Sequence, residues 1–273
     1  MTVLARVRAP ATTANIGPGF DCAAAALDLW NELEVSEGAG DGDGAHLGVR
    51  AFARIASPEG LGFSFTDRIP QQRGLGSSAA VVALGLVAGC VVAGRRPEQE
   101  ELLAAGVDLE GHPDNLAAAL AGGVCLTWGG RIARVGERLP AVPVVVVPAE
   151  TASTASARAD LPPELPHADA AHTVARAALL GAALSSGDQS LFAAALDDRL
   201  HEPYRAKNAP IFATIRARLP EGALGATLSG SGPSVVVWAR DEAVDGCADE
   251  LRRRFPDTRV LPLAVSPKGA GPA

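Results

Sequence analysis

The sequence has few aromatic residues, few cysteines and no long hydrophobic segment. Aromatic side chains make up 4% of the 273 residues, so the core must consist mainly of Ala, Val and Leu. The four cysteines are widely spaced and form no Cys-x-x-Cys pair, which argues against a zinc site and favours small buried thiols. The longest apolar stretch, residues 79–94, is shorter than the ~20 residues that span a bilayer, so it predicts a buried helix.

An excess of positive charge is missing as well. The formal net charge is -7, which argues against nucleic acid as a partner. The basic run Arg252-Arg253-Arg254 is most simply explained as the solvated face of a helix. The apolar run that begins at Val3 is interrupted at Arg6, too soon for a signal peptide. We therefore expect a cytoplasmic protein without membrane attachment.

The first half of the chain mixes strand and helix patterns. Alternation of apolar and polar residues predicts half-buried strands, and a Gly-rich turn separates the third of them from the long apolar helix. A seven-residue run of Gly, Ala and Asp at positions 38–44 predicts a surface loop. The predicted strands cover residues 3–8, 30–35, 63–69 and 124–128, the last followed by a Gly129-Gly130 hairpin turn.

The second half changes character near Pro140. Residues 142–147 form a continuous apolar run, as expected for a strand that is buried on both faces. The later pattern resembles part of a ferredoxin-like α+β layer, and the tail after Pro267 is expected to fray. We predict two domains, residues 1–139 and 140–273. The second contains expected helices at 168–186, 189–200, 211–219 and 242–255, and strands at 224–228, 234–239 and 259–263.

A Gly-rich loop before the long helix is the most informative motif. Gly74 and Gly76 let the backbone turn sharply near a bulky anion, and Ser77 and Ser78 open the helix, whose first amides lack partners. This combination predicts a phosphate site, with the serine hydroxyls free to cap the helix or to bind Mg²⁺. The loop comprises Pro70, Gln71, Gln72, Arg73, Gly74, Leu75, Gly76, Ser77, Ser78, Ala79 and Ala80.

The same loop allows three alternatives, of which the sequence removes one and disfavours another. An ordinary strand–turn–helix with a Ser N-cap needs no ligand and stays open. A Walker loop requires Gly-Lys-Ser/Thr, which does not occur in the chain. A dinucleotide fingerprint is met formally by Gly74, Gly76 and Ala79, but it normally follows the first strand of a parallel unit.

The order of motifs along the chain resembles the homoserine kinases of the GHMP kinase superfamily. The phosphate loop has the superfamily's form, and residues 10–21 and 228–234 match its N-terminal and C-terminal motifs. Further matches to homoserine kinases are Glu110-Gly111-His112-Pro113-Asp114-Asn115, Ser153-Thr154 with Arg158, and Glu202-Pro203-Tyr204-Arg205. The resemblance implies a two-domain α+β fold with a left-handed βαβ unit in the first domain and a ferredoxin-like second domain.

The resemblance also implies an activity and the residues that perform it. ATP would phosphorylate the hydroxyl of L-homoserine without a dedicated catalytic base, and a homodimer is possible. Ser78 and Glu110 would hold Mg²⁺, while Asn15 would contact the reacting hydroxyl. The arginines would bind the substrate carboxylate, and the other side chains would line the amino-acid pocket: Arg158 and Arg205, then Asp21, His112, Asp114 and Asn115. Without the resemblance, the arginines would be assigned to the surface and His112 to a structural role.

The chain also departs from the family pattern. Residues 22–26 read Cys-Ala-Ala-Ala-Ala where larger side chains are common, the segment between Glu34 and Ile69 is short, and His46 stands where relatives have Asn. These departures leave the purine contacts open. Two other functions also remain: a superfamily kinase for another small alcohol such as mevalonate, and a ligand-binding homologue without catalysis.

Overall fold

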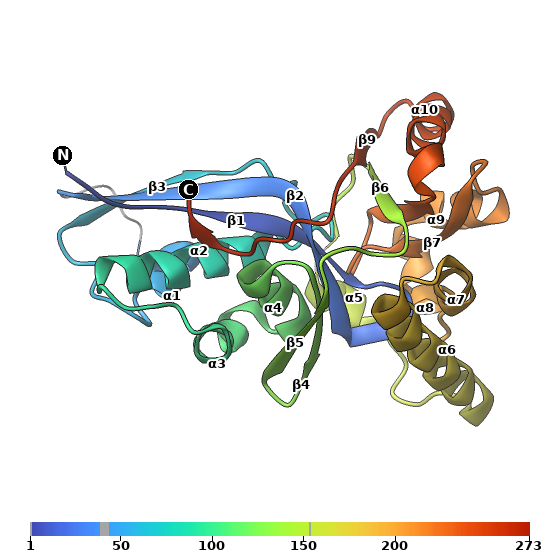
Figure 1. Cartoon of the computed structure of the whole chain (residues 1–273), viewed down its shortest axis with the longest axis horizontal. Helices are drawn as coiled ribbons and strands as arrows, with labels where there is room; N and C mark the ends of the chain where they lie inside the picture. Colours follow the sequence, from blue (N-terminus) through green and yellow to red (C-terminus); the bar gives the residue numbers. More distant parts are fainter. Residues whose placement is uncertain (1, 39–43, 153) are drawn as a thin grey trace.

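The chain folds around two antiparallel sheets that lie toward opposite ends of an elongated molecule (Figure 1). The computed structural model describes residues 2–38, 44–152 and 154–273, without the side chains of residues 154 and 155. Most of the predicted surface loop, residues 39–43, and Ser153 therefore lie outside the described residues. The strands of the first sheet are β1 (Val3–Asn15), β2 (Gly19–Glu37), β3 (Leu61–Thr66), β4 (Val124–Trp128), β5 (Arg131–Gly136) and β10 (Gly271–Pro272).

The first sheet is built on the long hairpin of β1 and β2. Strand order is β10-β1-β2-β4-β5, and β3 pairs with the outer part of β2. The predicted strands at 3–8 and 30–35 are confirmed, but both continue into Ala-rich sequence toward the hairpin turn. Small side chains there allow helix α4 to pack closely on the sheet, and Ala14, Ala24, Ala118 and Ala121 form one buried cluster with Cys125.

Among the described residues, four helices belong to the first part of the chain, and two of them pack on β1 and β2. Their bounds are α1 (Leu47–Phe52), α2 (Ser77–Val92), α3 (Gln99–Glu110) and α4 (Pro113–Ala121). Helix α2 is apolar on all sides because α1, α3, α4 and the sheet surround it, which confirms the predicted buried helix. No helix among the described residues combines the length and hydropathy needed to span a membrane.

The second sheet has the strand order β7-β8-β6-β9, which is the order of a ferredoxin-like sheet. Its inner strand β6 is buried on both faces, as its continuous run of valines predicted. The strands are β6 (Val142–Val147), β7 (Ala223–Leu228), β8 (Val235–Ala239) and β9 (Arg259–Pro262). The helices of this part are α5 (Thr154–Ala159), α6 (His167–Ser186), α7 (Gln189–Ala195), α8 (Glu202–Arg205), α9 (Pro210–Ala217) and α10 (Val244–Arg254).

Helix α7 is shorter than the predicted helix at 189–200. It ends at Ala195, and the side chain of Asp198 then accepts hydrogen bonds from the amides of Leu200, His201 and Glu202 at 2.8–3.0 Å. An Asp side chain that satisfies these amides replaces the carbonyl partners of a continuing helix. The resulting turn starts the short helix α8.

The prediction that the tail frays after Pro267 is wrong. From β9 the chain crosses back to the first sheet, where Ser266 N donates to Ala26 O at 2.9 Å and Gly123 N donates to Ser266 O at 2.7 Å. Strand β10 then pairs with β1, with Val7 opposite Pro272. The tail is short and rich in Gly and Ala, and no hydrophobic pattern marks it. Hydrogen bonds to its main chain, one of them from Arg134 Nη2 to Pro267 O at 2.8 Å, and the packing of Ala270 on the core hold it in place. The division at residue 140 and the left-handed crossover stay predictions.

Candidate active site

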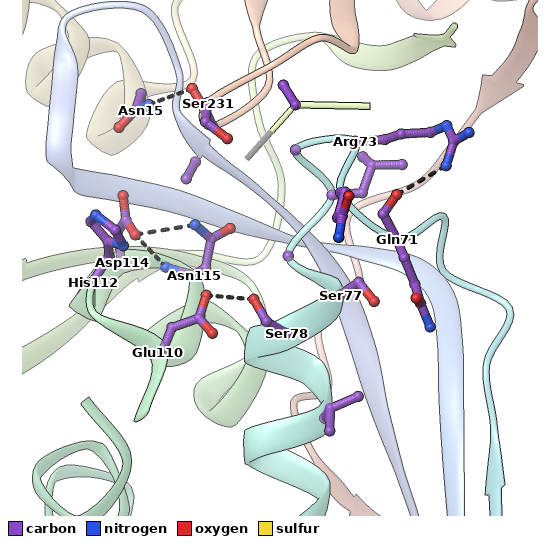
Figure 2. Close-up of a pocket in the computed structure, with 18 of the residues that line it drawn as sticks. Asn15, Gln71, Arg73, Ser77, Ser78, Glu110, His112, Asp114, Asn115 and Ser231 are labelled. Carbon is purple, nitrogen blue, oxygen red and sulfur yellow. Dashed lines mark hydrogen bonds between the residues drawn. The ribbon is translucent and has the colours of Figure 1, made fainter. Parts of the chain in front are cut away.

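One cavity of about 470 Å³ brings together the Gly-rich motifs of the sequence (Figure 2). Its walls are the end of β1, the loop between β3 and α2, the junction of α3 and α4, and the turn after β7. Eight residues of the predicted phosphate loop line it, from Gln71 to Ser78, whereas Pro70, Ala79 and Ala80 do not. Of the predicted substrate residues, the cavity is lined by Asn15, Asp21, His112, Asp114, Asn115 and Arg205.

The phosphate loop turns sharply into α2. Gly74 and Gly76 have φ of 73° and 63°, in the left-handed region that favours glycine. Gly76 is the N-cap of α2 and offers no side-chain hydrogen bond, so the amides of the first turn have no cap partner. The Ser N-cap alternative is therefore wrong. The preceding strand β3 pairs antiparallel with β2, whereas a dinucleotide fingerprint follows a strand of a parallel sheet. The dinucleotide alternative is therefore excluded as well.

Arg73 anchors the loop through its guanidinium group. It donates to the carbonyl oxygens of Pro148 at 2.9 Å, Ala149 at 2.6 Å and Gln71 at 2.9 Å. From the other side, Ser229 Oγ lies 2.6 Å from Gly74 O, and Thr12 N donates to Leu75 O at 3.1 Å. The loop is thus fastened to both sheets before any ligand binds.

Ser78 and Glu110 meet at the start of α2. Ser78 Oγ donates to Glu110 Oε1 at 3.0 Å, while Glu110 Oε2 is buried and has no hydrogen-bond partner. Burial, only partly offset by the bond from Ser78, raises the pKa of Glu110 to about 7. No group of three or more His, Cys, Asp or Glu side chains suited to a metal occurs among the residues described. This pair therefore offers one carboxylate and one hydroxyl to a ligand.

Asp114 and Asn115 lie at the start of helix α4, next to Glu110 (Figure 2). Asp114 is 2% exposed, and its Oδ1 accepts from the backbone amide of Asn115 at 2.7 Å. Burial raises the pKa of Asp114 to about 6, because the charged form loses solvation. Thr12 Oγ1 donates to Asn115 Oδ1 at 2.6 Å, which ties this helix start to β1.

Asn15 and Asp21 flank the β1–β2 turn in strained backbone conformations. Their φ values are 71° and 53°, which few non-glycine residues adopt. Asn15 Oδ1 accepts from Asp21 N at 3.1 Å, and Asn15 Nδ2 donates to Gly230 O at 2.9 Å. The Asn15 side chain is therefore fixed from both ends at the edge of the cavity.

Arg158 lies at the border of the site and is the one predicted substrate residue that does not line the cavity. It forms an ion pair with Asp21 at 2.5 Å, and its Nε donates to His112 Nε2 at 3.1 Å. His112 Nε2 is therefore an acceptor in a neutral ring. Burial and the neighbouring Arg158 charge both lower the pKa of His112.

Arg205 is 3% exposed and reaches the cavity from α8, so the assignment of this residue to the surface is wrong. Its guanidinium donates to Gly230 O at 3.2 Å and to Ala157 O at 3.3 Å. Burial lowers its pKa, against the opposing effect of Asp21. Gly230 O thus accepts from both Arg205 and Asn15.

Glu202, the buried acid that starts helix α8, belongs to a motif matched in the sequence but was assigned no role there. Glu202 is completely buried, its Oε1 accepts from Leu228 N at 2.8 Å, and its Oε2 lies 3.3 Å from Arg216 Nη1. Burial raises the pKa of Glu202 to about 8. It connects the helix that carries Arg205 to the end of β7. The signal in the sequence was its place in the motif with Arg205, three residues before that arginine.

Glu202→Gln is expected to make the protein relatively more stable at alkaline pH. The folded-state pKa of Glu202 is raised, so its contribution to stability is present at low pH and is lost as pH rises through about 8. As pH rises from 6 to 9.5, the free energy of unfolding of the variant should increase by on the order of 1–3 kcal/mol relative to that of the wild type. Thermal unfolding at both pH values measures this gain, with Glu34→Gln as a surface control. A constant difference between variant and wild type would contradict it.

One end of the cavity contains His46, which departs from the family pattern. His46 lines the cavity with Leu47, and its ring lies 4.1 Å from that of Phe65 between centroids. Its Nδ1 accepts from Gly48 N at 3.2 Å and caps α1. His46 therefore has a structural role in this chain.

Comparison with known proteins places these features in a family. Residues 45–123 match the GHMP kinases N terminal domain, and residues 178–257 match the GHMP kinases C terminal domain. A homoserine kinase from Streptomyces coelicolor is 39% identical, covering 96% of this chain and 96% of its own.

Solved structures agree with this match. The homoserine kinase from Cytophaga hutchinsonii superposes with a TM-score of 0.86 at 26% identity, covering 98% of this chain and 96% of its own. A mevalonate kinase superposes with a TM-score of 0.70 at 15% identity, covering 96% and 99%, which shows a shared fold alone. The chain belongs to the homoserine kinase family of the GHMP kinases, with the two-domain α+β fold that its motifs predicted.

Proposed function

We propose that the protein transfers the γ-phosphate of ATP to the side-chain hydroxyl of L-homoserine and releases O-phospho-L-homoserine. One observation carries this proposal: a single cavity contains the uncapped start of α2 together with Asn15, Asp114 and the buried Arg205. The residues proposed to bind phosphate and those proposed to bind the amino acid therefore line the same cavity. The relatives named homoserine kinase support the same acceptor, and the product would serve threonine biosynthesis.

The nucleotide half of the cavity suits ATP. Its volume of about 470 Å³ is within the ~300–1,000 Å³ of small-molecule sites. Free amides at the N-terminus of α2 and the glycine backbone at Gly74 and Gly76 favour phosphate oxygens. Membership of the GHMP kinases supports ATP as the phosphate donor.

Ser78 and Glu110 fit a magnesium ion. The buried Glu110 Oε2 has no partner, and a cation beside it would satisfy the oxygen and favour the charged form of the carboxylate. Mg²⁺ accepts one or two protein oxygens and completes its shell with phosphate oxygens and water, so a site without a cluster of carboxylates suits it. When bound, the ion would neutralise charge on the phosphates.

The acceptor half matches a small zwitterion. Arg205 and Arg158 supply positive charge for the carboxylate, while Asp114 and Asp21 supply negative charge for the ammonium group. Asn15, fixed by Asp21 N and Gly230 O, would orient the reacting hydroxyl toward the phosphate loop. His112, held by Arg158, and Asn115, held by Thr12, would complete the pocket wall.

Transfer in this site would depend on positioning and charge. No lysine lines the cavity in the described part of the chain, and Lys207 pairs with Asp160 at 2.7 Å. A phosphoryl transition state is loose, so little removal of the hydroxyl proton is needed before transfer. The first-turn amides of α2 would stabilise the charge that develops on the phosphoryl oxygens.

A coupled ADP-release assay with Mg-ATP tests the proposed acceptor. L-homoserine should give the highest kcat/KM among L-homoserine, L-serine, L-threonine and mevalonate. Mevalonate has a carboxylate but no ammonium group, so the buried Asp114 would disfavour it. Preference for mevalonate would identify a different small-alcohol kinase, and ATP binding without turnover would indicate a non-catalytic homologue. Cytoplasmic location and a homodimer stay predictions.

A further inference from the structure

Arg205 is a buried cation that has no carboxylate partner among the described residues. Its hydrogen bonds reach the carbonyl oxygens of Gly230 and Ala157, and its Nη1 lies 3.5 Å from the neutral ring nitrogen His201 Nδ1. Asp21, Asp114 and Asp198 act on this buried charge only from beyond ion-pair distance, so part of the compensating negative charge is missing. The bound carboxylate of an acceptor would supply that missing charge.

An aromatic ring lies beside this guanidinium. The Arg205 guanidinium carbon is 5.1 Å from the centroid of Phe20, and the Arg158 guanidinium carbon is 5.6 Å from the same centroid. Both distances are within the ~6 Å of a cation–π contact. One ring therefore interacts with both cations proposed to bind the acceptor carboxylate.

His201 supports the ring. The two rings are stacked with centroids 5.1 Å apart and an interplanar angle of 28°. His201 is completely buried, and its Nε2 donates to Gly17 O at 2.8 Å, in the turn that leads to Phe20. With Nε2 as donor in the neutral ring, Nδ1 is the acceptor that faces Arg205. Turn, ring and guanidinium are thus held as one unit.

We propose that Phe20 is a positioning residue, which holds the guanidinium groups of Arg158 and Arg205 together in the arrangement that binds the acceptor carboxylate. The proposal rests on the proposed function and adds a residue to it. Two guanidinium groups that converge on one carboxylate repel each other while the pocket is empty. Asp21 offsets the charge of Arg158 at 2.5 Å, and the electron-rich face of Phe20 attracts both groups.

Phe20→Leu removes the aromatic face but keeps an apolar side chain, and Phe20→Tyr keeps the face. The two variants are compared with two acceptors, L-homoserine and 3-amino-1-propanol, which is homoserine without its carboxylate. Phe20→Leu should raise the KM for L-homoserine about tenfold and leave the KM for ATP within about twofold. With 3-amino-1-propanol its kcat/KM should stay within about twofold of the wild type, and Phe20→Tyr should restore the KM for L-homoserine.

The control and the opposing outcomes separate positioning from stability. Phe255 makes the same kind of contact with Arg254 at 5.3 Å, and Phe255→Leu should leave both KM values unchanged. An equal loss of kcat/KM with both acceptors would mean that Phe20→Leu distorts the whole site, which overturns the proposal. An unchanged KM for L-homoserine in an active Phe20→Leu variant would overturn it as well. A wild-type protein that does not phosphorylate L-homoserine would instead overturn the proposed function, and this proposal with it.

Discussion

Gly74→Ala is expected to abolish most activity, with a fall in kcat/KM for ATP of at least about 100-fold. A Cβ at this position would collide with the backbone carbonyl of Ser229 and would lie 3.0 Å from Gly232 O. Both obstacles are main chain, so no side-chain rotation relieves them. The phosphate loop and the turn after β7 would have to separate, which would displace the amides proposed to bind the phosphates.

Gly60→Ala is the matched control for this substitution. Its φ is 72°, against 73° for Gly74, but a Cβ at Gly60 meets no atom within 4 Å. Both variants carry the left-handed backbone penalty of about 1–2 kcal/mol, and only Gly74→Ala adds the collision. Activity and thermal unfolding are measured for both. Equal activity in the two variants would contradict the close approach of the loop to Ser229.

Arg205→Met should raise the KM for L-homoserine by about 10- to 100-fold, with the KM for ATP within about twofold of the wild type. Met retains much of the apolar stem but removes the charged fork that would bind the acceptor carboxylate. Arg205→Lys should have a KM for L-homoserine between those of the wild type and Arg205→Met, because lysine keeps the charge without the bidentate geometry. Steady-state kinetics with each substrate varied in turn measure the separation.

A stability readout and a remote variant complete this experiment. Arg205 is buried, so circular dichroism must show that the Met variant is folded before its KM values are compared. Arg199→Met removes an arginine that is paired with Asp169 at 3.2 Å on the surface, and its kinetics should match the wild type. An equal rise in both KM values for Arg205→Met would show that Arg205 supports the whole cavity and does not select the acceptor.

The phosphate loop and the second sheet were readable from the sequence because local patterns encode them. Glycines, serines and an apolar run define the loop and α2, and runs of valine define β6 and β8. A short connection joins β7 to β8, which pair directly, but β6 and β7 follow one another in the strand sequence and do not pair, so the strand order needed the family resemblance. Family motifs then led to the residues that share the cavity.

Features that depend on contacts formed only in the folded chain could not be predicted. The tail is held by hydrogen bonds to Ala26, Gly123 and Ala119, and its short sequence of Gly, Ala and Pro gives no sign of them. Helix α7 ends early because the Asp198 side chain accepts hydrogen bonds from three backbone amides. This turn depends in its own right on the burial of His201 and Glu202. The Phe20 contact joins β2 to α5 and α8 across more than a hundred residues, and only the folded chain brings these segments together.

The identity of the phosphorylated product tests the central claim most directly. Purified protein is incubated with Mg-ATP and L-homoserine, and the mixture is followed by ³¹P NMR against authentic O-phospho-L-homoserine. The account predicts a phosphomonoester signal that coincides with the standard and grows in step with ADP. ADP that accumulates with inorganic phosphate alone, or no reaction with L-homoserine beside turnover of another alcohol, would contradict it.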